Sequence, residues 1–256
     1  MKRYVYLIIT AVAVVAAGTV QAAGDAARGE AEFAVCAVCH GEQGEGLEKY
    51  GAPKIGGQED WYIVTSLKNF RAGLRAKDNC DVADVAGTLE WAKAQSPDYA
   101  EIEADLETHF EGGLPSGGEC SQPSNDVYGS LMRAIALTLA DEQVVEDLAA
   151  YATSLTPPNP PVTVAGDVSE GRNGYLTCIS CHLEQGEGNA MVNAPAVAGQ
   201  HDWYTVRQLE HYFSGVRGSD PANIFDVQMR MMTTCCLLTP EAIKNVAAYI
   251  NTFTKP

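Results

Sequence analysis

Apolar residues recur at helical spacing near the end of each half of the chain. The two segments are LADEQVVEDLAAYATSL at 139–155 and LTPEAIKNVAAYINTF at 238–253, and the apolar face of each ends in Ala-Ala-Tyr. Acidic residues open the first segment at Asp141, and Thr239 before a proline provides a cap for the second. We therefore predict that both segments are amphipathic helices.

A second helical pattern occurs twice, in GGQEDWYIVTSLKNFRAGLR at 56–75 and in AGQHDWYTVRQLEHYFSGVR at 198–217. In the first copy Trp61, Val64 and Leu67 recur at helical spacing, which predicts that they form a face turned toward a core.

These segments belong to an internal repeat. Residues 36–75 and 178–217 align at a constant offset of 142, with 19 identities in 40 positions. The match extends upstream, where Gly29 corresponds to Gly171, so an early helix can cross the last helix of each half closely at that glycine. Two homologous, mostly helical domains are the simplest account of such a repeat.

The domain boundaries follow from the repeat and from a stretch rich in proline. We predict a first domain at 23–155, with an insertion at about 78–126, and a second domain at 166–256. The segment 156–165 between them begins TPPNPP, which predicts an extended, semi-rigid linker.

The N-terminus carries an apolar run of a different kind. Residues 1–3 are Met-Lys-Arg, residues 4–18 are almost wholly apolar, and residues 20–22 are Val-Gln-Ala. This order predicts a signal peptide at 1–22 and a periplasmic mature protein, although an uncleaved anchor would share some of the pattern. An apolar stretch this short is more typical of a signal peptide than of a membrane span.

The composition is strongly acidic. The chain of 256 residues has a formal net charge of −16, and loss of Lys2 and Arg3 with the signal peptide would make it −18. We do not expect so acidic a protein to bind nucleic acid. Its electric field would steer it toward basic patches on partner proteins.

Four of the eight cysteines lie in the motifs CAVCH and CISCH. Cysteines of an exported chain usually form disulfides, but Cys-x-x-Cys-His is the attachment motif of c-type haem. The thiols of Cys36 and Cys39, and those of Cys178 and Cys181, are spaced to form thioethers with the two vinyl groups of one porphyrin. The sequence therefore predicts two covalently bound haem c groups.

The histidine that follows each cysteine pair, His40 or His182, is the expected proximal ligand of the haem iron. A single Cys-x-x-Cys would also suit a thioredoxin-like redox pair or half of a zinc site. Two copies with histidine in the same place, in an exported chain without a βαβ pattern, argue against both alternatives.

Two prolines follow these histidines at the same distance of 13 residues, Pro53 after His40 and Pro195 after His182. Each proline carbonyl can accept the Nδ1 proton of its histidine, which would orient the ring. A simple loop turn at each proline is the alternative and is compatible with that role.

Paired tryptophans and arginines are candidates for the haem environment. Trp61 and Trp203 can direct an indole N–H at a haem propionate, and Arg75 and Arg217 can neutralise its charge. The alternatives are core packing for the tryptophans and a solvated surface position for the arginines.

An iron that only transfers electrons needs a sixth ligand. Met132 is the single methionine of the mature first half, and counting from the last helix selects Met231 in the second half. Met232 is the reserve, Met229 stays open, and core packing is the usual role of any one methionine. His109 is the rival ligand in the first half, but it lies in the insertion that the repeat lacks.

The twin CAVCH and CISCH motifs, the GGQEDWY and AGQHDWY segments, and late methionines before an Ala-Ala-Tyr helix resemble the di-haem cytochrome c4 family. The resemblance covers nearly all of the mature chain apart from the insertion. It implies an all-α fold of two tandem class I cytochrome c domains, packed as a pseudo-symmetric pair with both haems close enough to exchange electrons. Similar di-haem chains also serve as electron-accepting subunits of larger dehydrogenases.

The insertion is a departure from that family. Residues 76–131 contain 12 acidic residues against Lys77 and Lys93. Within them, SPDYAEIEADLETHF at 96–110 predicts a helix with Ser96 as its cap and an apolar stripe of Tyr99, Ile102, Leu106 and Phe110 that lies on the haem domain. Its acidic side is either a docking surface for a basic partner or a solubilising flap.

The other four cysteines are Cys80, Cys120, Cys235 and Cys236. A Cys80–Cys120 disulfide closing the insertion is the economical pairing, and Cys235 and Cys236 can pair with each other or elsewhere.

Two functions remain after these observations. The favoured one is a periplasmic electron carrier without a catalytic site, serving respiratory-chain or dehydrogenase partners, with peripheral membrane association as a further option. The alternative is the haem subunit of a redox enzyme, such as one that oxidises sulfide or another sulfur compound, with one iron open or differently ligated.

Overall fold

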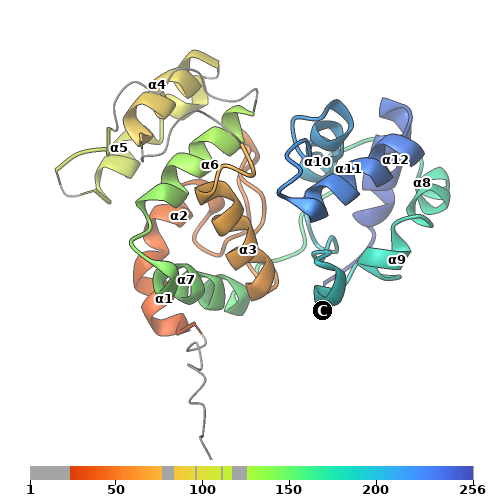
Figure 1. The fold of residues 1–256 in the computed structure, drawn as a ribbon, viewed down its shortest axis with the longest axis horizontal. Helices are drawn as coiled ribbons and strands as arrows, with labels where there is room; N and C mark the ends of the chain where they lie inside the picture. Colours follow the sequence, from red (N-terminus) through yellow and green to blue (C-terminus); the bar gives the residue numbers. More distant parts are fainter. Residues whose placement is uncertain (1–23, 77–83, 96, 111, 117–125, 256) are drawn as a thin grey trace, which may run out of the picture.

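A computed structural model describes residues 24–76, 84–95, 97–110, 112–116 and 126–255. Those residues form helices, turns and loops with no β-strand, and the helices divide into two groups that lie side by side (Figure 1). The predicted all-α, two-domain architecture is thus confirmed. The predicted signal peptide lies outside the described residues.

The two groups contain corresponding elements in the same order. The N-terminal half contains α1 (Ala26–Glu32), α2 (Ala34–His40), the 3₁₀ turn η1 (Glu48–Tyr50), α3 (Asp60–Arg71), α6 (Val127–Thr138) and α7 (Glu142–Ser154). The C-terminal half contains α8 (Val168–Tyr175), α9 (Ile179–His182), η3 (Ala190–Val192), α10 (Asp202–Ser214), α11 (Ile224–Cys236) and α12 (Pro240–Ile250). The insertion adds α4 (Val85–Gln95), η2 (Pro97–Ala100) and α5 (Glu103–Glu107) to the N-terminal half.

The first and last helices of each half cross at a glycine, as predicted. A Cβ atom on Gly29 of α1 would lie 2.0 Å from the carbonyl oxygen of Asp147 on α7. The same atom on Gly171 of α8 would lie 1.9 Å from the carbonyl oxygen of Asn245 on α12. Only a residue without a side chain permits this approach of two backbones.

The predicted caps of the last helices are present. Asp141 accepts a hydrogen bond from the amide of Val144 at 2.9 Å, and Thr239 accepts one from Ala242 at 3.1 Å. Each bond satisfies one of the amides that a helix start leaves without a partner.

The core-facing side of α3 agrees in part with the predicted one, because Leu67 is buried and Val64 packs against the core cluster, whereas Trp61 does not. Its buried residues are Ile63, Leu67 and Phe70, whereas Trp61 and Val64 are only partly buried. The spacing correctly indicated a helix, but α3 contacts both the core and the other half. Apolar residues therefore occupy more than one face.

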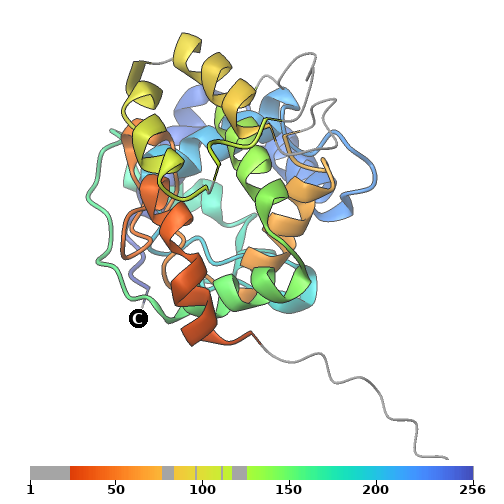
Figure 2. The same ribbon diagram turned by 90° about the vertical axis from the view of Figure 1, so that its left-hand side faces the viewer.

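The insertion covers one end of the N-terminal half, and both views place α4 and α5 over α2 and α6 (Figures 1 and 2). Tyr99, Ile102 and Leu106 are at most 1% exposed, so the predicted apolar stripe is confirmed for these three residues, whereas the fourth member, Phe110, is only half-buried and lies outside their cluster. The prediction of one continuous helix is wrong, because a 3₁₀ turn precedes the short α5. Tyr99 lies in η2 and Ile102 is the residue that precedes α5, and both still face inward.

Two further features of the insertion concern the predictions. Helix α4 was not predicted, and it adds the buried residues Leu89 and Ala92 to the same apolar layer. Ser96 lies outside the described residues.

Residues 155–167 connect the two halves without regular secondary structure. The ammonium group of Lys54 donates to the carbonyls of Pro157 and Pro158, both at 3.3 Å, which ties this segment to the N-terminal half. Within the described residues, no helix is long and apolar enough to cross a membrane.

Candidate functional site

Each Cys-x-x-Cys-His motif ends a short helix beside a proline carbonyl. His40, the last residue of α2, donates from Nδ1 to the Pro53 carbonyl at 2.8 Å, and His182 at the end of α9 makes the same bond to Pro195 at 2.8 Å. A carbonyl can only accept, so the proton lies on Nδ1 and the lone pair of Nε2 is left for a metal. Both predicted hydrogen bonds are present.

Burial sets the ionisation of these motifs. It lowers the pKa of His40 and of His182, against a smaller raising effect of the proline hydrogen bonds, so both rings are neutral near pH 7. Burial also raises the pKa of Cys36 and of Cys39 to about 12. Redox-active Cys-x-x-Cys pairs lower the pKa of a thiol, so this environment does not suit a thioredoxin-like site.

The four motif cysteines are free and face a cavity of about 350 Å³ that both halves line. His40 and His182 line it as well, together with an apolar wall. Free thiols at the haem spacing, a neutral imidazole beside each pair and apolar walls fit a haem group in each half.

The methionines of α6 and α11 differ in whether they line the cavity. Met132, Met229 and Met232 line the cavity, whereas Met231 is 64% exposed and lies outside its lining. The prediction of Met231 is therefore wrong. Successive helical residues are about 100° apart, so Met231 lies about 200° around α11 from Met229.

The methionines of the two halves correspond when α6 and α11 are aligned at their N-terminal caps. Asp126 caps α6 and Asn223 caps α11, and Met132 and Met229 each lie six residues after the cap. The sequence contained a signal for this pairing, because each of these two methionines is followed by arginine. Counting back from the last helix was two residues off, because α11 is one residue longer than α6 and because the count paired Ala140 with Thr239, whereas the observed caps are Asp141 and Thr239.

The rival ligand His109 lies at the surface of the insertion. Its Nδ1 is 2.8 Å from the Asp105 carbonyl oxygen, and its ring is not part of the cavity lining.

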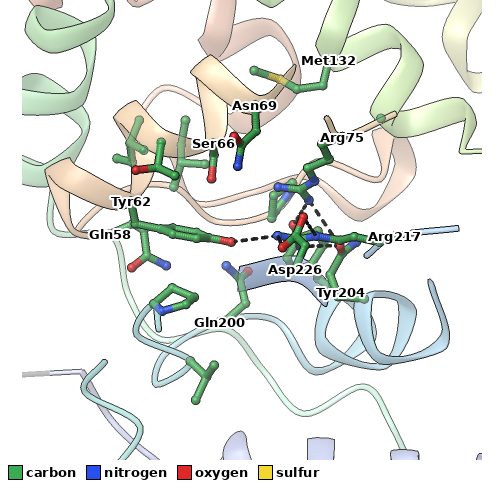
Figure 3. A pocket seen from close by; sticks show the side chains of 18 of the residues that line it. Gln58, Tyr62, Ser66, Asn69, Arg75, Met132, Gln200, Tyr204, Arg217 and Asp226 are labelled. Atoms are coloured by element: carbon green, nitrogen blue, oxygen red, sulfur yellow. Dashed lines mark hydrogen bonds and ion pairs between the residues drawn. The ribbon is translucent and has the colours of Figure 1, made fainter. Parts of the chain in front are cut away.

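The predicted arginines line the cavity at the contact between the halves (Figure 3). Arg75 donates to the hydroxyl of Tyr204 at 2.9 Å, and Arg217 makes the reciprocal bond to Tyr62 at 3.5 Å. Arg217 also pairs with the buried Asp226 at 2.9 Å. Burial would raise the pKa of Asp226, but the charges of Arg217 and Arg75 and the hydrogen bonds from Arg217 and Tyr212 together outweigh it, so the pKa lies below its usual range.

Trp61 and Trp203 lie beside this cluster, outside the cavity lining. Trp61 packs edge-on against Tyr62 at 5.8 Å between ring centroids, and Trp203 lies 5.1 Å from the guanidinium of Arg207.

Sequence reasoning missed Arg207. Its guanidinium donates to the Gly51 carbonyl and stacks over Tyr128 at 4.2 Å, which joins the two halves. The Nε atoms of Arg75 and Arg207 are buried without a hydrogen-bond partner among the described residues, although both side chains line the cavity. Buried donors left without acceptors are costly, so they fit an anionic group such as a haem propionate.

Two glutamines make a symmetric contact that was also missed. Gln58 donates to the Ala196 carbonyl at 3.1 Å, and Gln200 donates to the Lys54 carbonyl at 2.9 Å. The pairs are related by the repeat offset, so the halves pack with approximate two-fold symmetry. The glutamine common to GGQEDWY and AGQHDWY was the available signal.

Cys235 and Cys236 form a disulfide with each other at the exposed end of α11. Cys80 and Cys120 lie outside the described residues.

Comparison with known proteins agrees with this geometry. A helical domain with Cys-x-x-Cys-His beside a methionine-lined cavity is typical of a c-type cytochrome, and a family model described as cytochrome c matches residues 26–108 and 168–254. The chain belongs to the cytochrome c family, as a di-haem member of the cytochrome c4 group. It holds two covalently attached haem c groups and is an electron carrier.

The individual relatives span most of the chain. Cytochrome c4 of Azotobacter vinelandii is 27% identical over 241 residues, 91% of each chain. The crystal structure of reduced cytochrome c4 from Pseudomonas stutzeri matches with a TM-score of 0.57 at 23% identity, over 90% of this chain and 100% of that one. A thiosulfate dehydrogenase electron acceptor of Thiomonas intermedia is 25% identical over 204 residues, 79% of this chain and 73% of its own length.

Proposed function

We propose that both irons are six-coordinate, with His40 and Met132 as the axial ligands in the N-terminal half and His182 and Met229 in the C-terminal half. The observation that carries this proposal is the cavity, on which each half presents a buried neutral histidine and a methionine from the facing helix. A histidine and methionine pair gives a high potential, which suits an electron carrier.

The chain's own residues account for the carrier role. When bound, each haem supplies reversible one-electron iron chemistry. The Pro53 and Pro195 carbonyls hold the two histidine rings in one orientation, which limits reorganisation when the charge of the iron changes. Arg75 and Arg207 present buried donors to the propionates at the contact between the halves.

An absorption spectrum with haem quantitation tests the ligand set. We expect two haems per chain, a far-red methionine-to-ferric-iron band of full strength, and no rapid binding of added cyanide. A band of half strength with rapid cyanide binding would show one open iron and would contradict the proposal.

A second candidate is the electron-accepting subunit of a sulfur-oxidising dehydrogenase, favoured by the similarity to the Thiomonas intermedia acceptor. In that case thiosulfate alone should leave the oxidised protein unchanged, and thiosulfate with a thiosulfate dehydrogenase should reduce both haems. Reduction by thiosulfate alone would instead indicate a catalytic site in this chain.

The cellular location of the chain and the surface charge of its partners are further proposals. We place the mature chain in the periplasm and expect redox partners with basic surfaces, because the chain has a net charge of −16. Peripheral association with a membrane would then occur through such a partner. Association rates should fall as salt is raised from about 10 to 150 mM, since the Debye length shortens from about 30 to 8 Å.

The insertion's role as an acidic docking surface can be tested without deleting it. Deletion would expose the apolar layer under Tyr99, Ile102 and Leu106. The exposed Glu101 and Glu107 can instead be changed to glutamine. Slower association at low salt would support docking, and unchanged rates would show a solubilising surface.

A further inference from the structure

Exposed large apolar side chains are distributed unequally between the two halves. Among the described residues, every exposed large hydrophobic side chain lies at or beyond Val162. The described part of the N-terminal half has none, although the two halves share one fold. Contiguous exposed apolar surface on a soluble protein usually marks a site of interaction.

The insertion explains the difference. In the N-terminal half, Val35, Val38 and Cys39 of α2 pack against the buried layer that α4, η2 and α5 provide. Leu89, Ile102 and Leu106 are at most 1% exposed in that layer. The chain therefore covers the cysteine side of its first haem site with its own insertion.

The C-terminal half lacks this cover. At the repeat offset of 142, Cys181 corresponds to Cys39 and is exposed. When α6 and α11 are aligned at their N-terminal caps, Ile224, Phe225 and Met232 correspond to Val127, Tyr128 and Ile135 of the covered side. All three are apolar, and they are 53%, 42% and 43% exposed.

We define the open face as Cys181, Met191, Val192, Ile224, Phe225 and Met232. Met191 is 94% exposed at its edge, whereas Cys181, Val192, Phe225 and Met232 also line the cavity. The open face thus connects the C-terminal haem site directly with the surface. No such route exists on the corresponding described side of the N-terminal half, because the insertion occupies it.

The chemistry of the open face indicates what binds there. None of its residues is charged, nor is any residue of the segment 189–195 that contains Met191 and Val192. The covered side shows what this kind of surface accepts, namely an uncharged apolar stripe of the type formed by Tyr99, Ile102 and Leu106. A second copy of the chain would bring another net charge of −16 to the contact, which opposes self-association.

We propose that redox partners dock on the open face through an apolar, uncharged surface around their own cofactor, and that electrons enter and leave the protein there. Electrons of the N-terminal site then pass through the C-terminal site. This inference rests on the electron-carrier function. Long-range attraction by net charge sets the approach, while the final contact is apolar.

Adsorption tests the surface without electron transfer. The probe is a methyl-terminated alkanethiol monolayer on gold, and adsorbed haem-loaded protein is weighed with a quartz microbalance. We expect adsorption that changes less than about twofold between low and high salt. The variant M191K/I224K should bind at least about tenfold more weakly, a difference of about 1.4 kcal/mol. V162K, at another exposed apolar position, serves as the matched control.

Electron exchange tests the route. The reduced protein is mixed with an excess of an oxidised blue-copper protein whose copper lies beneath an apolar patch, so that each ferrous haem gives one electron to one Cu(II). We expect both haems to oxidise at least about tenfold more slowly in M191K/I224K and at the normal rate in V162K.

Three results would overturn the proposal. In the first, half of the haem in M191K/I224K is oxidised at the normal rate, which would mean direct exchange at the N-terminal site. In the second, the variant changes neither the adsorption nor the oxidation rate. In the third, sedimentation shows a dimer of the unaltered protein that the variant abolishes. A protein without two reducible haems would instead refute the carrier function itself.

Discussion

At the residue scale, the methionines of α11 differ in exposure because of helical phase. Met229 faces the cavity and Met231 faces solvent, although both are immediate neighbours of Arg230 in the sequence. We predict that M229A abolishes the methionine band of the C-terminal haem and so halves the far-red absorbance. M231A should leave it unchanged. A loss of absorbance in M231A alone would reverse the assignment.

Asp147 provides a pH-dependent prediction. Its carboxylate accepts from Arg28 at 2.6 Å and from the Asp25 amide at 2.7 Å, and these bonds hold the pKa of Asp147 well below its usual range. A carboxyl group with a lowered folded-state pKa stabilises the fold above the unfolded pKa of about 3.9, and the contribution is lost as pH falls toward the folded value.

We therefore predict that D147N lowers the free energy of unfolding at pH 7 and that this difference shrinks below about pH 4. The C-terminal half already has asparagine at this place, where Asn245 accepts from the Asp167 amide at 2.8 Å. The variant should thus keep the backbone bond and lose the ionic one. Denaturant titrations across pH would contradict this if the difference stayed constant.

At the scale of elements, each half depends on one close helix crossing. G171A would place a methyl group 1.9 Å from the Asn245 carbonyl oxygen, so α8 and α12 must move apart. We predict a loss of about 2–3 kcal/mol in the free energy of unfolding. S169A, at an exposed site of the same helix, should have little effect. Equal stabilities for the two variants would show that the crossing can relax.

At the scale of the whole molecule, the glutamine contacts join the halves. Gln58 and Gln200 make three hydrogen bonds across the contact, each contributing on the order of 1 kcal/mol. We predict that Q58A/Q200A separates a single calorimetric unfolding transition into two, because coupling between the halves weakens. Q185A, at an exposed loop position, should retain one transition. A single transition in the double variant would mean that the arginine cluster suffices.

The sequence by itself determined the features that are local or repeated. Two haem motifs, a histidine 13 residues before each proline, the helix caps and the glycine at each crossing were all readable, because each depends on a few residues in fixed spacing. The apolar stripe of the insertion was readable for the same reason, although its division into η2 and α5 was not.

Only the tertiary structure decided which side chains share a surface. The choice of Met229 over Met231 depends on where α11 begins, and the arginine and glutamine contacts depend on how the halves pack. The covered and open sides of the two haem sites depend on where the insertion folds. Spacing along the chain specifies one face of one helix, whereas contact between faces is a property of the packed molecule.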